Sequence, residues 1–185
     1  MSDRILSTEP LAPPLGAIVL RSLAIAAVIV GLALGPTLYG HGAEYLAFIR
    51  SHRLHAPDLK PILAASPVIQ AHLASVLAAV ALGVTLMSGV KGNRLHRTLG
   101  WAWSSFMMLT AASALFIPSQ GPGLIFLKLF AVLTLASVPA AVWSARSHKV
   151  GRHARIMTSL FVGGIGVAGV LAFLPGRLMW SVFFG

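Results

Sequence analysis

The chain of 185 residues contains no cysteine, and beyond Asp58 it contains no aspartate or glutamate. The absence of cysteine excludes disulfides, thiolate nucleophiles and iron–sulfur ligation. The absence of carboxylates after Asp58 excludes paired-carboxylate acid/base catalysis, an aspartyl phosphate and a conventional hard-cation site in that stretch. A Ser-His-Asp triad is disfavoured for the same reason, because no acid is available to orient a histidine base. Histidine is therefore the residue type most able to carry chemistry here.

Apolar residues are abundant and charged residues are scarce. Apolar residues make up 57% of the chain, charged residues 10%, and the mean hydropathy is +0.85, values typical of a protein whose main solvent is lipid. The net charge of +10 does not indicate a nucleic-acid partner, because Lys and Arg separate apolar runs instead of covering one face with interleaved aromatics. The expected partner is a lipid bilayer.

Long apolar runs predict an all-α, integral membrane helical bundle. Each run can cross a hydrocarbon core of about 30 Å at about 1.5 Å per residue, and each is bounded by proline, glycine or basic residues. The first run exceeds the core of a signal peptide, so we interpret it as an uncleaved helix. The sequence therefore predicts five transmembrane helices: Ala17–Tyr39, Pro67–Gly89, Leu99–Ile117, Leu124–Ala145 and Ile156–Leu174.

These helices divide the chain into three parts. Residues 1–66 form the first helix and a link, residues 67–175 form a four-helix membrane core, and residues 176–185 form a short C-terminal tail. Pro139 in the fourth span is expected to kink that helix.

Basic residues predict the orientation of the bundle. The links 90–98 and 146–155 are rich in Lys and Arg, whereas the link 118–123 between them carries no charge. Helix parity puts both basic links on one side, which the positive-inside rule makes cytoplasmic. We therefore expect a multi-pass protein of the cytoplasmic (inner) membrane, with the N-terminus inside and the C-terminus outside. The link 40–66 also carries basic residues, and we expect a short interfacial helix there, around Glu44–Ile49.

Two histidines share an unusual register. His96 lies 22 residues before Pro118, and His153 lies 22 residues before Pro175. Both helices are expected to run from inside to outside, so the two imidazoles should lie at one depth, about 33 Å below the outer ends. Two imidazoles at one depth on neighbouring helices are what bis-histidine ligation of a haem iron requires.

Other residues would complete such a site. Gly100 and Gly164 are expected to line the gap for the porphyrin, and guanidinium groups around it could pair with haem propionates. The alternative is that these His and Arg residues face lipid headgroups and only satisfy the positive-inside bias. The arginines concerned are Arg94, Arg97, Arg152 and Arg155.

A second polar layer is expected near the outer face. His72 comes five residues after Pro67, and Lys128 comes five residues after Gly123. Both helices enter from outside, so both groups should lie about 7–8 Å deep, where a polar side chain is retained at a cost. We expect the two to approach each other or a common ligand such as a quinone. A plain interhelical hydrogen bond of His72 is the alternative.

Three segments carry a resemblance to a known family. They are residues 72–83, which begin HLAS and end LG, residues 94–101 (RLHRTLGW) and residues 152–157 (RHARIM). Over roughly residues 67–175 the chain resembles the bacterial membrane-protein family known as domain of unknown function 2306. That family looks like a distant relative of the di-haem transmembrane cytochromes b, four-helix cores with one haem near each membrane face that exchange electrons with ascorbate, quinol or iron.

The resemblance implies one ligand pair and leaves another incomplete. In the cytochromes b, ligands on the third and fifth of the five helices pair, and His96 and His153 match these positions. Ligands on the second and fourth helices also pair, but the fourth helix here has no histidine and carries Lys128 at that depth, so His72 lacks a partner.

The reading favoured by the sequence is a membrane cytochrome b-like electron-transfer protein. It would hold one haem b near the cytoplasmic face and exchange electrons with a partner such as quinone, alone, as a homo-oligomer or within a larger membrane redox complex. The alternative is a haem-free accessory or assembly subunit of a larger membrane complex, for which faces of small residues would be natural. A transporter is disfavoured by the lack of inverted repeats and midplane charges.

Overall fold

The protein is described by a computed structural model that covers residues 14–118 and 124–184, in which every regular element is a helix. The elements are α1 (Leu15–Ser51), α2 (Lys60–Leu63), α3 (Pro67–Ser88), α4 (Arg94–Phe116), α5 (Leu124–Arg146), α6 (Val150–Ser159), the π-helix η1 (Leu160–Ile165), α7 (Gly166–Ala172) and α8 (Leu178–Phe183).

Four helices within the described residues are long and apolar enough to cross a membrane: Pro67–Ser88, Arg94–Phe116, Leu127–Arg146 and Val150–Ala172. They correspond to the second to fifth expected spans. The chain is therefore an all-helical, multi-pass membrane protein, and lipid is its environment. The first expected span, Ala17–Tyr39, lies inside α1, but its crossing of the bilayer stays a prediction.

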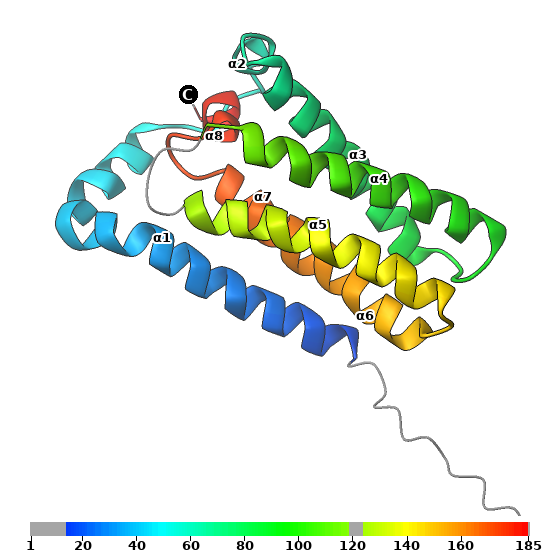
Figure 1. Cartoon of the computed structure of the whole chain (residues 1–185). Coiled ribbons are helices and arrows are strands. Elements are labelled where there is room, and N and C mark those ends of the chain that lie inside the picture. The colour runs from blue at the N-terminus through cyan, green and yellow to red at the C-terminus, as the bar shows by residue number, and fades with distance from the viewer. Residues whose placement is uncertain (1–13, 119–123, 185) are drawn as a thin grey trace, which may run out of the picture.

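The four spans form a ring. α3 packs on α4, α4 on α5 and α5 on α6, while η1 contacts both α3 and α5. α1 lies alongside the ring, against α6, η1 and α7 (Figure 1). α4 and α6 have few or no direct backbone contacts and therefore lie diagonally across the ring. Both basic links and the start of α1 lie at one end, whereas α2 and α8 lie at the other (Figure 1).

The centre of the ring is closed by packed side chains. Ala79, Trp103, Met107 and Val138 are buried together, and Gly83 lies where α3 meets two aromatic rings. A Cβ on Gly83 would run into the ring of Phe161 and would lie 2.9 Å from Nε1 of Trp103. The missing side chain of Gly83 is thus what lets these rings lie against the α3 backbone.

Polar side chains fix the helix ends near the basic links. Asn93 is the N-cap of α4, and its side-chain oxygen accepts a hydrogen bond of 2.7 Å from the backbone N–H of His96. Lys91 donates through Nζ to the carbonyl oxygens of Leu86, Met87 and Gly89, at 2.7, 2.7 and 2.9 Å. These carbonyls end α3, so Lys91 acts as a C-terminal cap.

The last span differs from a continuous α-helix. Its residues Leu160–Ile165 form the π-helix η1, between α6 and α7. A π-helix places more residues in each turn than an α-helix. Equal residue counts before Pro118 and Pro175 therefore do not give equal heights, and His153 lies somewhat less deep than the count of 22 implies.

The long link before α3 also differs from the expectation in detail. The segment Glu44–Ile49 is helical, but it continues α1 past a break at His41, where φ is −135° and ψ is 28°. Nδ1 of His41 and the carboxylate of Glu44 lie 3.3 Å apart at this break. The expected interfacial helix is thus joined to the first helix.

An outer cap covers the end of the ring opposite the basic links. We use this name for residues 48–58 together with α8. The backbone N–H groups of His55 and Asp58 donate to Phe183 and Val182, at 3.0 and 2.9 Å. Trp180 stacks on Phe184 with ring centroids 4.6 Å apart. The expected C-terminal tail is therefore a helix that packs on the link. Partial burial of the Arg177 guanidinium at the start of this helix lowers its pKa.

Candidate functional site

His153 lies in the first turn of α6, and its ring is oriented by α5. Its Nδ1 is 3.0 Å from the carbonyl oxygen of Ala141, and the residue is partly buried. Since a carbonyl can only accept, Nδ1 carries the proton and donates. In the tautomer with the proton on Nδ1, Nε2 keeps its lone pair. Histidine ligands of metals are commonly held in this way, with one ring nitrogen fixed by a carbonyl.

His96 lies in the first turn of α4, at the same end of the ring. The Asn93 cap fixes its backbone, while its imidazole has no hydrogen-bond partner among the described residues. His153 and Lys91 lie in its neighbourhood.

Two glycines were expected to line a gap beside the pair. A Cβ on Gly100 or on Gly164 would meet no atom within 4 Å. Gly100 follows His96 by one helical turn, so both lie on one face of α4. Gly164 lies in η1, further than His153 toward the C-terminal end of the same span.

The arginines near the pair are unpaired. Arg94, Arg97, Arg152 and Arg155 are exposed, and none forms an ion pair in the part of the chain that the structure describes. The N-terminal ends of α4 and α6 add positive partial charge there. This end of the protein therefore attracts anionic groups.

The described residues offer a small donor set. No group of three or more His, Cys, Asp or Glu residues gathers among residues 14–118 and 124–184. A zinc or calcium site would need more protein ligands than a pair. Two histidines are sufficient for haem, because the porphyrin supplies the other four nitrogens.

His72 belongs to a hydrogen-bonded layer between α3 and α4. Its Nδ1 lies 3.0 Å from the carbonyl oxygen of Thr110 and 3.0 Å from Oγ of Ser113. The Ser113 hydroxyl donates to the Leu109 carbonyl at 2.7 Å, so its oxygen is free to accept from His72. Thr110 donates to Ser75 at 2.9 Å. His72 thus makes the interhelical hydrogen bond that was the alternative to a ligand-binding role.

Lys128 lies on α5 and is exposed. No hydrogen bond or ion pair joins it to His72 in the described ranges, and the two residues are on helices that lie diagonally in the ring. Their convergence on a common ligand stays a prediction.

The bond between His72 and Ser113 can be measured by a double-mutant cycle. We expect His72→Ala and Ser113→Ala each to lower the unfolding free energy in detergent, with a coupling of about 0.6–2 kcal/mol, the usual range for interhelical bonds in membranes. The pair Thr85→Ala and Ser113→Ala is the control, because Thr85 donates only to the Ala81 carbonyl of its own helix. A coupling no larger than in the control would contradict a direct bond.

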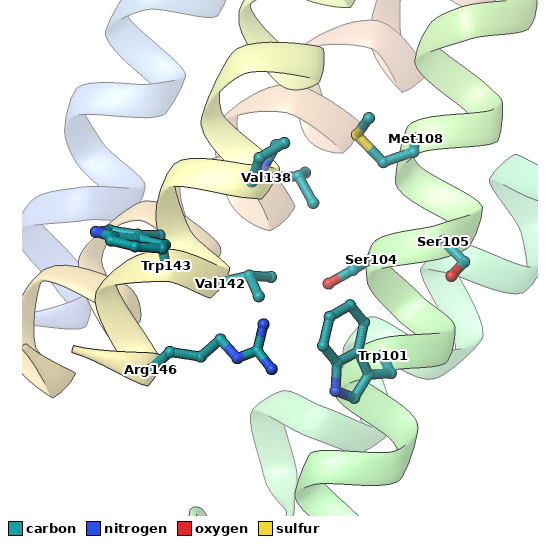
Figure 2. Close-up of a pocket in the computed structure, with 9 residues that line it drawn as sticks. Trp101, Ser104, Ser105, Met108, Val138, Val142, Trp143 and Arg146 are labelled. Carbon is teal, nitrogen blue, oxygen red and sulfur yellow. The ribbon is translucent and has the colours of Figure 1, made fainter. Parts of the chain in front are cut away.

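A groove between α4 and α5 was not anticipated from the sequence. Its volume is about 540 Å³, within the range of small-molecule sites. Figure 2 shows the Arg146 guanidinium reaching from the end of α5 toward the Trp101 indole on α4, with Val138, Val142 and Met108 further along the groove. The sequence feature that could have indicated this groove is a basic residue at the end of one apolar helix together with a tryptophan near the start of another. This is a common pattern at membrane interfaces.

Comparison with family models, curated proteins and solved structures gives no significant match to this chain. The functional reading therefore depends on the residues and their geometry.

Proposed function

We propose that this protein is a membrane cytochrome b-like electron-transfer protein that binds one haem b between His96 and His153, at the basic end of the bundle. The observation that carries the proposal is the bond from His153 Nδ1 to the Ala141 carbonyl. It fixes one tautomer and one orientation of the ring and leaves Nε2 available, as an axial ligand would need.

Neighbouring residues support the proposal. Both imidazoles are in first turns of helices that face each other across the ring, and Gly100 presents no side chain beside His96. The exposed arginines Arg94, Arg97, Arg152 and Arg155 would hold the propionates at the rim through charge-assisted hydrogen bonds. When bound, haem would supply a one-electron carrier. The carbonyl of Ala141 would make the His153 ring a stronger donor.

The electron partner belongs to the same proposal. A quinone near His72 and Lys128 is the partner that the outer polar layer favours, because Nε2 of His72 is left without a bond by the pairing of Nδ1. Nε2 could then accept a proton or a hydrogen bond from a hydroquinone. Assembly as a homo-oligomer or within a larger membrane redox complex is part of the same proposal.

A second candidate is a haem-free accessory or assembly subunit. The close packing at Gly83 favours it, because a bundle centre filled by Phe161 and Trp103 is complete without a cofactor. Small-residue contacts of this kind are also how helices of membrane assemblies join.

The absorption spectrum of the purified protein separates the two candidates. The protein should be produced with ample haem and reduced with dithionite. A low-spin b-type spectrum with close to one haem per chain is expected. A colourless, well-folded protein would remove the cytochrome proposal and leave the accessory subunit.

Topology can be tested with reporter fusions. We expect fusions at Asn93 and Lys149 to report the cytoplasm and a fusion after Phe184 to report the outside, because basic links are retained inside. An expected outside site at Gln120 lies beyond the described residues. Cytoplasmic signals at both Lys149 and Phe184 would mean that the last span does not cross.

A further inference from the structure

The groove between α4 and α5 changes character along its length. At the basic end it holds the Arg146 guanidinium and the Trp101 indole, and deeper in the bundle it is lined by Met108, Val138 and Val142 (Figure 2). Val142 and Val138 lie one and two turns before Arg146, so the apolar lining extends about 12 Å inward at about 1.5 Å per residue. A charged mouth and an apolar interior match an amphiphile with an anionic head.

Arg146 has no anionic partner among residues 14–118 and 124–184. The chain has no Asp or Glu beyond Asp58, and the ion pair recorded for residues 14–118 and 124–184 joins His41 to Glu44 at the other end of the bundle. A guanidinium at a membrane interface is most stable when an anion neutralises it. The part of the chain that the structure describes thus supplies no counter-ion to Arg146, and an anionic ligand would neutralise it.

Ser104 is a second unpaired group, and its hydroxyl points into the groove (Figure 2). The residue is only 5% exposed. The other buried serines of the described ranges donate to backbone carbonyls of their own helices: Ser75 to His72 at 2.8 Å, Ser113 to Leu109 at 2.7 Å and Ser144 to Ala140 at 2.8 Å. Ser104 makes no such bond, so its donor is free for a ligand.

We propose that this groove binds one anionic phospholipid from the leaflet at the basic end. The phosphate pairs with the Arg146 guanidinium, the Ser104 hydroxyl donates to a glycerol ester carbonyl, and an acyl chain lies along Met108, Val138 and Val142. Ser104 lies one turn deeper than Trp101, which suits an ester that lies just below a phosphate. A neutral quinone would use the same donors but would leave the guanidinium charge unneutralised.

Native mass spectrometry of the full chain tests the proposal. The probes are phosphatidylglycerol and phosphatidylcholine with identical acyl chains, titrated into delipidated protein in neutral detergent. We expect phosphatidylglycerol to bind at least about tenfold more tightly, and Arg146→Gln to remove about tenfold of its affinity, as loss of a charge-assisted hydrogen bond does. Lys149→Gln removes a neighbouring positive charge outside the groove and should change affinity by less than about twofold.

A second pair of variants probes the apolar part. Val142→Trp fills the groove and is expected to abolish lipid retention, whereas Val132→Trp adds the same side chain to an exposed position on the same helix and should leave retention unchanged. Thermal melting in detergent checks that each variant is folded. Equal binding of the two lipids, equal losses for Arg146→Gln and Lys149→Gln, or full retention in folded Val142→Trp would overturn the proposal. Displacement of phosphatidylglycerol by an equal amount of a neutral quinone would do the same.

Discussion

Replacement of His96 or His153 by alanine is expected to abolish the low-spin b-type spectrum while leaving the protein inserted in the membrane. A haem held by His96 and His153 would need both imidazoles, so removal of either would remove the bis-histidine state completely. His153→Ala also deletes the partner of the Ala141 carbonyl. The measurement is the reduced-minus-oxidised difference spectrum of purified variants, normalised to protein, with haem content determined separately.

Two histidines provide matched controls for this experiment. His148 is exposed in the link between α5 and α6, and His148→Ala should keep the full spectrum. His72→Ala should also keep it, because the bonds of His72 to Thr110 and Ser113 hold α3 against α4 near the other end of the bundle. A spectrum that survives in His96→Ala or His153→Ala, or that is lost equally in His148→Ala, would rule out the assigned ligand pair.

Gly83→Ala is expected to destabilise the bundle, whereas Gly169→Ala is not. A methyl on Gly83 would overlap the Phe161 ring and crowd Trp103 Nε1, whereas a methyl on Gly169 would meet nothing within 4 Å. Overpacking of this kind costs about 1–3 kcal/mol. Both changes gain about 0.5–1 kcal/mol of helix propensity, so the difference between the two variants isolates the cost of the contact.

The free energy of unfolding in mixed micelles is the measurement for this pair. Phe161→Leu should recover part of the stability lost in Gly83→Ala, because a smaller side chain makes room for the added methyl. Equal stability of Gly83→Ala and Gly169→Ala would mean that the rings can move aside without cost, and that the centre of the bundle is loosely packed.

Hydropathy and helix-ending residues were enough to predict the four spans of the ring. Pro67 marks the start of α3, as a proline in the first turn does, and Asn93 caps α4 just before the basic residues that begin it. These features are local, so they can be recognised without knowing the fold. The helix α8 could not be recognised in this way, because its apolar face is buried by a link that lies far away in the sequence.

The sequence predicted the approximate depth of the candidate histidines in the membrane, but not the orientation of their side chains. Counting residues places His96 and His153 near one membrane face, yet the π-helix η1 alters the height of one of them, and the ring pose of His153 depends on a carbonyl of a neighbouring helix. The contacts of His72 likewise depend on how α3 and α4 turn toward each other. The sequence does not single out Arg146, because an arginine at a helix end is common. Its lack of an anionic partner among the described residues becomes informative only beside the groove.

The outer cap has a consequence for the order in which the protein is made. His55 and Asp58 are synthesised early, but their backbone partners in α8 emerge only after every span of the ring. Until then the aromatic side chains of the link, Phe48 and His52, have no Trp180 to pack against. Until α8 is synthesised, water is the partner available to these two N–H groups, so the link closes onto α8 only after the four spans of the ring have been made.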